Sequence, residues 1–269
     1  MKSKIRKRIT VRLAALVAAA LPLALIAAAP AFAAAPTNDE ITNATVISTM
    51  PFHDSVPDMT QATWNPTTDQ SNCGGWTESV WYQITPTSTG PIAIDIAGSN
   101  NGAFVIDAFT GTPGSLVNVG CSQFGLMLNA TAGTTYWIMA SSACCITGGS
   151  LNLTVYPGVA PQATLAVHGT GLVDKGRNVT ISGTINCTGF VVNPGAVTGT
   201  VRQVYRRIYS ITANFSATNG CGGKQTWSAL AQPTTGGFGK GYATVNASES
   251  ICNLAGCATP TVTLVIKLK

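Results

Sequence analysis

The alternation of apolar and polar residues over short segments constrains the fold of this chain more than any other feature. In residues 78–86, Val80, Tyr82 and Ile84 fall on one side of an extended chain, and Trp81 falls on the other. A period of two in β-branched and aromatic residues, ended by a proline, predicts a β-strand. Because large apolar residues occur on both sides, we expect this strand to be packed on both faces.

Similar short segments follow at intervals of about ten residues, separated by Gly- and Pro-containing turns. We expect residues 91–97 to form a hairpin with the first strand, and a lone hairpin needs a second sheet for stability. The later segments are 103–109, 116–119, 124–129, 134–140 and 150–156. Since no helical apolar period of useful length accompanies them, residues 34–157 predict an antiparallel, jelly-roll-like β-sandwich.

A Pro/Gly break at residues 157–161 suggests a linker, which we place at residues 158–162. The alternation then restarts and continues to residue 269, which predicts a second, immunoglobulin-like β-sandwich at 163–269. In its last segment Lys267 and Lys269 share one side with Val265. Lysines of this kind would suit an edge strand that must not pair with a neighbouring molecule.

The N-terminus has the pattern of a secretory signal peptide in residues 1–33. Six basic residues occur in the first twelve positions, an apolar run follows, and Ala31–Ala33 has the small-residue pattern of a cleavage site. A transmembrane anchor is the alternative, but Pro22 interrupts the run. After cleavage, nine basic and ten acidic residues remain. We therefore expect a secreted protein, not inserted in a membrane, that is extracellular or held non-covalently at a cell surface.

The charges are few, at 9% of residues, and unevenly distributed. Residues 34–158 contain eight acidic residues and no Lys or Arg, whereas residues 159–269 contain nine basic and two acidic residues. Opposite charges could hold the two domains together or direct them to different partners. Compositional drift between two separately acquired modules is the other interpretation.

The cysteines divide evenly, with four in each predicted domain, which in a secreted chain predicts disulfides. They are Cys73, Cys121, Cys144, Cys145, Cys187, Cys221, Cys252 and Cys257. Adjacent cysteines rarely bond to each other, since Cα atoms in a disulfide are usually further apart than 3.8 Å. We therefore expect Cys73 and Cys121 each to pair with Cys144 or Cys145.

In the second domain, Cys252 and Cys257 bracket a short loop, so we expect them to pair and to leave Cys187 with Cys221. A structural zinc site is the alternative, but it requires a second tight cysteine pair that the sequence lacks. We predict no metal site.

The sequence offers little for catalysis. Its two histidines, His53 and His168, are not part of an H-E-x-x-H or G-x-S-x-G motif. A catalytic triad assembled across the fold, or a carboxylate pair for sugar hydrolysis, remains an alternative. The carboxylates available for such a pair are Asp54, Asp58, Asp69, Glu78, Asp95 and Asp107. Asp95 and Asp107 lie within strand patterns, and we interpret the loop acids as solvated surface, so we expect no enzyme and no cofactor.

Binding is better supported than catalysis. Tyr205, Arg206, Arg207 and Tyr209, with Arg202 nearby, combine aromatic rings with guanidinium groups. Such a surface can hold polyanions or stack on sugar rings. Nucleic acid would use the same physics, but secretion favours a cell-wall polymer or acidic polysaccharide. The alternative is an ordinary solvent-facing strand.

Two tryptophans are further candidates for binding. Trp64 and Trp76 flank a long polar loop. They could form a platform on which sugar rings stack, or they could cap the core of the sandwich.

Several short motifs of the first domain together match one known family: Asn38–Glu40, Asn43–Ala44, Pro51–Phe52, Ser79–Tyr82, Pro86, Phe109–Gly111 and Ala132–Tyr136. On these residues the first domain resembles the bacterial pre-peptidase C-terminal domain, a jelly-roll-like module of secreted hydrolases and surface proteins. The resemblance implies an accessory role in secretion, surface attachment or substrate binding. Some relatives bind calcium, but Ala103 and Ser122–Phe124 stand where the family often has acidic residues, which argues against calcium here.

The second domain is similar to a small domain of unknown activity in secreted proteins of high-GC Gram-positive bacteria. The similarity rests on residues 179–187, Cys221, Trp227, residues 241–247, Cys252 and Cys257. It implies a disulfide-bonded sandwich and no activity.

Together these features predict a secreted, non-catalytic protein that binds extracellular or cell-wall polysaccharide. An inhibitor or regulator of a secreted hydrolase, with a secreted protein as partner, is the first alternative. A hydrolase of unrecognised type is the second. The oligomeric state does not follow from the sequence.

Overall fold

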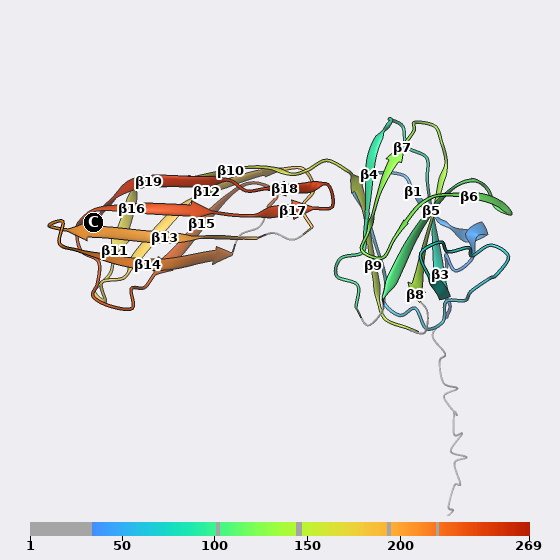
Figure 1. Ribbon diagram of the computed structural model, residues 1–269, viewed down its shortest axis with the longest axis horizontal. Helices are drawn as coiled ribbons and strands as arrows, with labels where there is room; N and C mark the ends of the chain where they lie inside the picture. The colour runs from blue at the N-terminus through green and yellow to red at the C-terminus, as the bar shows by residue number, and fades with distance from the viewer. Residues whose placement is uncertain (1–33, 101–102, 144–146, 193–194, 219–220) are drawn as a thin grey trace, which may run out of the picture. The chain divides into compact units, whose positions relative to one another are not determined.

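The computed structural model describes residues 34–269 except 101–102, 144–146, 193–194 and 219–220 (Figure 1). The predicted signal peptide, residues 1–33, and Cys144 and Cys145 therefore lie outside the described residues. The described part of the chain is built from β-strands and one 3-10 turn, η1 (Ile41–Asn43). None of its elements is a helix that is long and apolar enough to cross a membrane.

The first nine strands form two sheets around one hydrophobic core. One sheet has the order β1-β3-β8-β5-β6 and the other the order β2-β9-β4-β7. Strands β3 and β4 therefore lie in different sheets, so the predicted hairpin between them was wrong. Apart from β1, which joins β3 in parallel, these are the two four-stranded sheets of a jelly roll, as predicted. The bounds are β1 (Thr45–Ile47), β2 (Phe52–Val56), β3 (Gly75–Ile84), β4 (Gly90–Asp95), β5 (Phe104–Thr112), β6 (Ser115–Ser122), β7 (Leu126–Ala130), β8 (Tyr136–Ala143) and β9 (Leu151–Pro157).

Strand β3 is buried on both faces, which confirms the interpretation of its sequence. Tyr82 points into the core between the two sheets. Trp81 points to the opposite side and packs in a smaller cluster with Ile41, Phe109 and Met139. The N-terminal segment and the loop before β3 therefore cover the outer face of this sheet.

The remaining strands form a second sandwich with its own core. Strands β10, β12 and β15 pair in one sheet, and β11-β19-β16-β13-β14 form the other. Strand β11 pairs with both β12 and β19, so it links the sheets as the split first strand of an immunoglobulin-like sandwich does. The bounds are β10 (Gln162–Val167), β11 (Thr170–Val173), β12 (Val179–Thr188), β13 (Ala196–Tyr205), β14 (Tyr209–Thr218), β15 (Gly223–Ala231), β16 (Gly241–Ser248), β17 (Ile251–Asn253), β18 (Gly256–Ala258) and β19 (Thr261–Leu268).

Strand β19 is not an edge strand, so the prediction drawn from its lysines was wrong. It lies between β11, to which it is parallel, and β16, to which it is antiparallel. Its lysines project outward from an interior strand, since Ile266 and Leu268 occupy the buried side. Period-two alternation reports which face a residue takes and does not report the position of a strand in its sheet.

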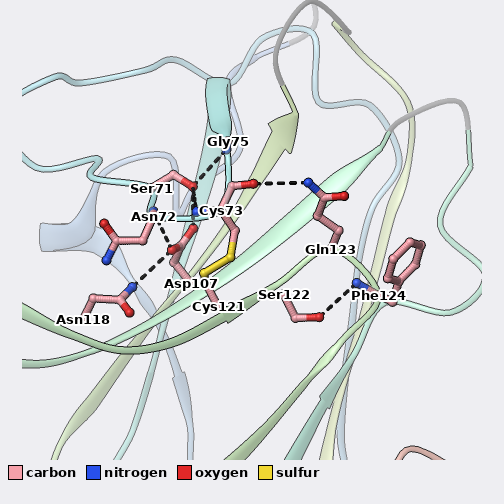
Figure 2. Close-up of a disulfide and its surroundings, with 10 residues drawn as sticks. All are labelled: Ser71, Asn72, Cys73, Gly75, Asp107, Asn118, Cys121, Ser122, Gln123 and Phe124. Atoms are coloured by element: carbon pink, nitrogen blue, oxygen red, sulfur yellow. Dashed lines mark hydrogen bonds between the residues drawn. A yellow bond between two sulfur atoms is a disulfide. The ribbon is translucent and has the colours of Figure 1, made fainter.

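The disulfides of the second sandwich are those predicted, Cys187–Cys221 and Cys252–Cys257. In the first sandwich the prediction was wrong, because Cys73 bonds to Cys121 with their Cα atoms 5.9 Å apart (Figure 2).

The buried carboxylate of Asp107 on β5 explains the Cys73–Cys121 pairing. It accepts hydrogen bonds from Ser71 Oγ at 2.7 Å and from the Asn72 backbone at 3.0 Å (Figure 2). The loop before β3 is thereby held against β5, and Cys121 lies opposite Asp107 in the register of β5 and β6. This long-range contact places the two sulfur atoms together.

Candidate binding surface

Basic residues of the second sandwich gather at one end, which we call the basic end. Strand β19 ends there, in register with the start of β16 and with β11. The turn from β11 to β12, the β13–β14 hairpin and the loop before β16 lie at the same end (Figure 1). Eight of the nine basic residues of this half occur there: Lys175, Arg177, Arg202, Arg206, Arg207, Lys240, Lys267 and Lys269. The ninth, Lys224, begins β15 at the opposite end.

The β13–β14 hairpin carries two arginines at its tip in an unusual backbone conformation. Ile208 N donates to Tyr205 O at 2.9 Å and closes the turn. The two central residues have positive φ, 46° at Arg206 and 61° at Arg207, as in a type I′ turn. This conformation favours Asn-Gly, and costs residues with a Cβ roughly 1–2 kcal/mol each. Having arginines at these two positions therefore lowers the stability of the folded chain relative to Asn-Gly.

The side chains at the tip are available to a ligand. Ile208 is 82% exposed and Tyr209 is 57% exposed. Tyr209 stacks on Tyr205 with ring centroids 5.1 Å apart and an interplanar angle of 17°. Neither Arg206 nor Arg207 has a hydrogen-bond or ion-pair partner among the described residues. Cationic groups and an aromatic face are thus presented together.

Hydrogen bonds connect the base of the β13–β14 hairpin to the loop before β16. The Tyr205 hydroxyl group donates to the side-chain oxygen of buried Gln203. That side chain also holds the backbone of Gly239, donating at 2.8 Å and accepting at 2.9 Å. Arg177 donates to Gly237 O at 2.8 Å and to Phe238 O at 3.2 Å. Tyr205 and Arg177 therefore support the loops, whereas the arginines of the tip have no such contact within the described residues.

Arg202 does not join the cluster in which the sequence suggested it. It points from the outer face of β13, three residues before Tyr205, while Tyr205 turns toward the core. Its neighbours across the sheet lie on β16 and β19, where exposed Tyr242 and Lys267 share the same face. The sequence analysis missed Tyr242, although buried Ala243 and Val245 place it on the outer side by alternation.

The two tryptophan candidates have different outcomes. Trp64 is half-buried and packs against the cluster on the outer face of β3, which is separate from the core between the two sheets. It also lines a shallow hollow of about 220 Å³ with Pro66 and Gln70. The side chain of Trp76 lies outside the described part of the structure.

The loop acids of the first sandwich are not all solvated, contrary to expectation. Asp69 is buried and accepts from Asn65 N, Ser79 Oγ and Trp81 Nε1 at 2.7–3.1 Å. Glu78 is also buried and accepts from Gly148 N and a serine hydroxyl group. Among the described residues, no three His, Cys, Asp or Glu side chains are arranged to hold a metal.

Both histidines contact a hydroxyl group on the surface. His168 Nδ1 lies 3.0 Å from Ser182 Oγ, and His53 Nδ1 lies 3.1 Å from Thr154 Oγ1. Neither ring is hydrogen-bonded to a carboxylate in the part of the chain that the structure describes. A triad needs that third group to orient the imidazole, so these pairs do not form one.

No protein-family model matches the chain, and neither does any curated protein. Several solved structures show low similarity. A β-glucuronidase of Bacteroides uniformis is 10% identical over 72% of this chain, with a TM-score of 0.25. A β-galacturonidase from Eisenbergiella tayi is 11% identical over 82% of this chain, with a TM-score of 0.21. A DUF4785 family protein from Legionella pneumophila is 9% identical over 88% of this chain, with a TM-score of 0.25.

The chain spans only part of these proteins: 28% of the glucuronidase, 43% of the galacturonidase and 68% of the Legionella protein. Similarities at this level do not identify a function.

Proposed function

We propose that this chain is a secreted, non-catalytic protein that binds an anionic extracellular or cell-wall polysaccharide at the basic end of its second sandwich. In this proposal the first sandwich has the accessory role that its resemblance to the pre-peptidase C-terminal domain implies. Disulfides in both sandwiches are typical of proteins in oxidising compartments, which supports an extracellular location.

The observation that carries the proposal is the Arg206–Arg207 pair. The two guanidinium groups are exposed and have no partner in the part of the chain that the structure describes, and the backbone that presents them is strained. Strained backbone persists where the surrounding structure holds it, and it is concentrated at functional sites. Guanidinium groups suit carboxylate, sulfate and phosphate groups, and the neighbouring ring of Tyr209 suits a sugar face.

The electrostatic environment supports an anionic ligand. Asp174, in the turn from β11 to β12, accepts hydrogen bonds from the side chain and the backbone of Asn178, which hold its pKa below the usual value, so one carboxylate stands against the eight cations of the basic end. The other acid of this half, Glu249, is buried. Clustered cations of this kind attract polyanions over about one Debye length, roughly 8 Å at physiological ionic strength.

The test is retention of the full chain on immobilised polygalacturonate and on purified bacterial cell wall, eluted with a salt gradient. We expect Arg206→Ser and Arg207→Ser to elute at a lower salt concentration than the wild type, and the double variant at a lower concentration still. Lys224→Ser is the matched control, since it removes one positive charge at the opposite end of the sandwich. We expect it to elute with the wild type.

Equal shifts for Arg206→Ser and Lys224→Ser would mean that net charge alone governs retention, and would overturn the proposal. So would unchanged retention of the double variant.

A further inference from the structure

The outer face of the β14-β13-β16-β19 layer has a regular composition that the proposed function does not use. Over most of its length the outward side chains are hydroxyl or amide groups. Thr200, Asn246 and Thr263 form one such row, in which Thr263 Oγ1 donates to Asn246 Oδ1 at 2.8 Å. A shallow depression of about 340 Å³ lies over these strands. Groups of this kind both donate and accept hydrogen bonds, as sugar hydroxyls require.

Toward the basic end the composition of the face changes from polar to aromatic and cationic. Tyr242 on β16 is 69% exposed. Lys267 on β19 lies directly opposite it in register, which places their Cβ atoms roughly 4.5–5.5 Å apart. On the other side, Arg202 pairs with Thr244 and is therefore diagonal to Tyr242, with Cβ atoms roughly 7–8 Å apart. One aromatic ring thus has a cation on each side.

The backbone at this position is already satisfied. Strand β16 is paired along its length with β19 and over most of it with β13, so no strand of another chain can add there. Recognition must use the side chains alone. An exposed ring between two cations, continued by rows of hydroxyl and amide groups, is complementary to a ring-shaped ligand that carries negative charge and many hydroxyls.

We infer that Tyr242, Arg202 and Lys267 form a subsite for a carboxylate-bearing sugar residue of a polysaccharide. The sugar stacks on the tyrosine ring while its carboxylate lies between the ammonium and guanidinium groups. The neighbouring residues of the polymer extend over the hydroxyl and amide rows. This inference rests on the proposed function, because the subsite and the hairpin tip would contact the same polymer.

The test compares the wild type with Tyr242→Ala, Tyr242→Phe, Lys267→Gln and Arg206→Ser/Arg207→Ser by isothermal titration calorimetry. The probes are sodium polygalacturonate, dextran sulfate and neutral dextran. We expect Tyr242→Ala and Lys267→Gln each to weaken polygalacturonate binding roughly five- to tenfold, and Tyr242→Phe to bind within about twofold of the wild type. For dextran sulfate, which needs charge alone, Tyr242→Ala should match the wild type. We expect no binding to neutral dextran.

Val265→Ala is the control, since it removes apolar area from the same face without touching the ring or the cations. Thermal unfolding of each variant verifies that it is folded, as expected for exposed positions. Equal polygalacturonate affinity for the wild type, Tyr242→Ala and Lys267→Gln would overturn the subsite. If the tip variant alone lost affinity, the proposed function would stand without the subsite. If only the Tyr242 and Lys267 variants lost affinity for polygalacturonate, the subsite would be supported and the role proposed for the hairpin tip would be overturned.

Discussion

The two sandwiches use charge in opposite ways. In the first, all eight charged side chains are carboxylates, and they accept hydrogen bonds from hydroxyl, amide and backbone groups. Four of them, Asp69, Glu78, Asp95 and Asp107, are buried. In the second, eight of the nine basic residues lie at one end, and the two at the hairpin tip have no partner among the described residues. Charge in the first sandwich organises loops, whereas we propose that the two arginines at the tip of the second engage a ligand.

The comparison also explains how a sandwich without a single Lys or Arg tolerates buried carboxylates. A buried ionised group needs compensation, which several hydrogen bonds to one carboxylate provide. Asp69 receives such bonds from strand β3 and from the loop before it, so it ties the long loop to Trp81 on β3. An acidic composition in this half is therefore a structural requirement, and it gives no information about partners.

The largest expected effect concerns a feature that the two sandwiches share. Cys73–Cys121 and Cys187–Cys221 close segments with sequence separations of 48 and 34. Because loop-closure entropy grows slowly with length, replacing either pair by serine should lower the free energy of unfolding by about 3–4 kcal/mol. Urea unfolding of both double variants measures this. A loss confined to one sandwich would show that the covalent frameworks are not equivalent.

A smaller loss is expected where charge is structural. Asp69→Asn should lower the free energy of unfolding by about 2–3 kcal/mol, because an NH2 group replaces one of the two oxygens that accept from the buried indole, hydroxyl and amide donors. Arg206→Ser should leave it unchanged or raise it. Urea unfolding of the two variants side by side checks the contrast, which fails if the arginine variant is the less stable.

The hairpin tip predicts a gain in stability with a loss of binding. Arg206→Asn together with Arg207→Gly places the preferred pair in the turn and should stabilise the second sandwich by about 1–2 kcal/mol. The same variant should elute from polygalacturonate at a lower salt concentration. Thermal unfolding and retention measured on one preparation test both parts. Unchanged stability would show that the arginines fit the turn without strain.

The smallest expected effect is a pH dependence in the first sandwich. Burial raises the pKa of Asp107 above its usual 3.8, and the hydrogen bonds from Asn72, Ser71 and Asn118 only partly oppose it. The folded chain therefore retains this proton to a higher pH than the unfolded chain does. The contribution of Asp107 to the free energy of unfolding is therefore largest below pH 3.8, and it is lost as the pH rises through the pKa of the folded state.

The difference in unfolding free energy between the wild type and Asp107→Asn, followed from pH 3 upward, isolates this contribution. We expect the wild type to lose stability relative to the variant across that window. A difference that does not change with pH would mean that Asp107 titrates alike in both states.

Much of the fold follows from the sequence because burial repeats every two residues. The alternation located strands β3 to β9, and the apolar residues on both sides of β3 indicated its double burial. Both disulfides of the second sandwich could be predicted, because the short spacing of Cys252 and Cys257 pairs them and leaves Cys187 with Cys221. The Cys73–Cys121 bond did not, because it depends on which strand receives a distant loop, and that contact is made by Asp107.

The candidate surface was only partly predictable for a related reason. The sequence shows aromatic and basic residues close together around Arg206. It did not predict the turn, because a type I′ turn usually has Asn-Gly at its two central positions and this one has Arg-Arg. Alternation places Arg202 and Tyr205 on opposite faces of β13. It also places Tyr242 on the outer face of the sheet, the face that Arg202 occupies. The register between β13, β16 and β19 brings Tyr242 beside Lys267 and Arg202, and register is a tertiary property.

The parallel pairing of β11 with β19 has a mechanical consequence. Lys267 N and Lys269 N donate to Gly169 O and Gly171 O, and Val173 N donates to Lys269 O, at 2.9–3.1 Å. Tension applied at residues 158 and 269 pulls these two strands in opposite directions along their length. The hydrogen bonds between the two strands then carry the load in shear and must rupture together, which gives the second sandwich a high resistance to stretching.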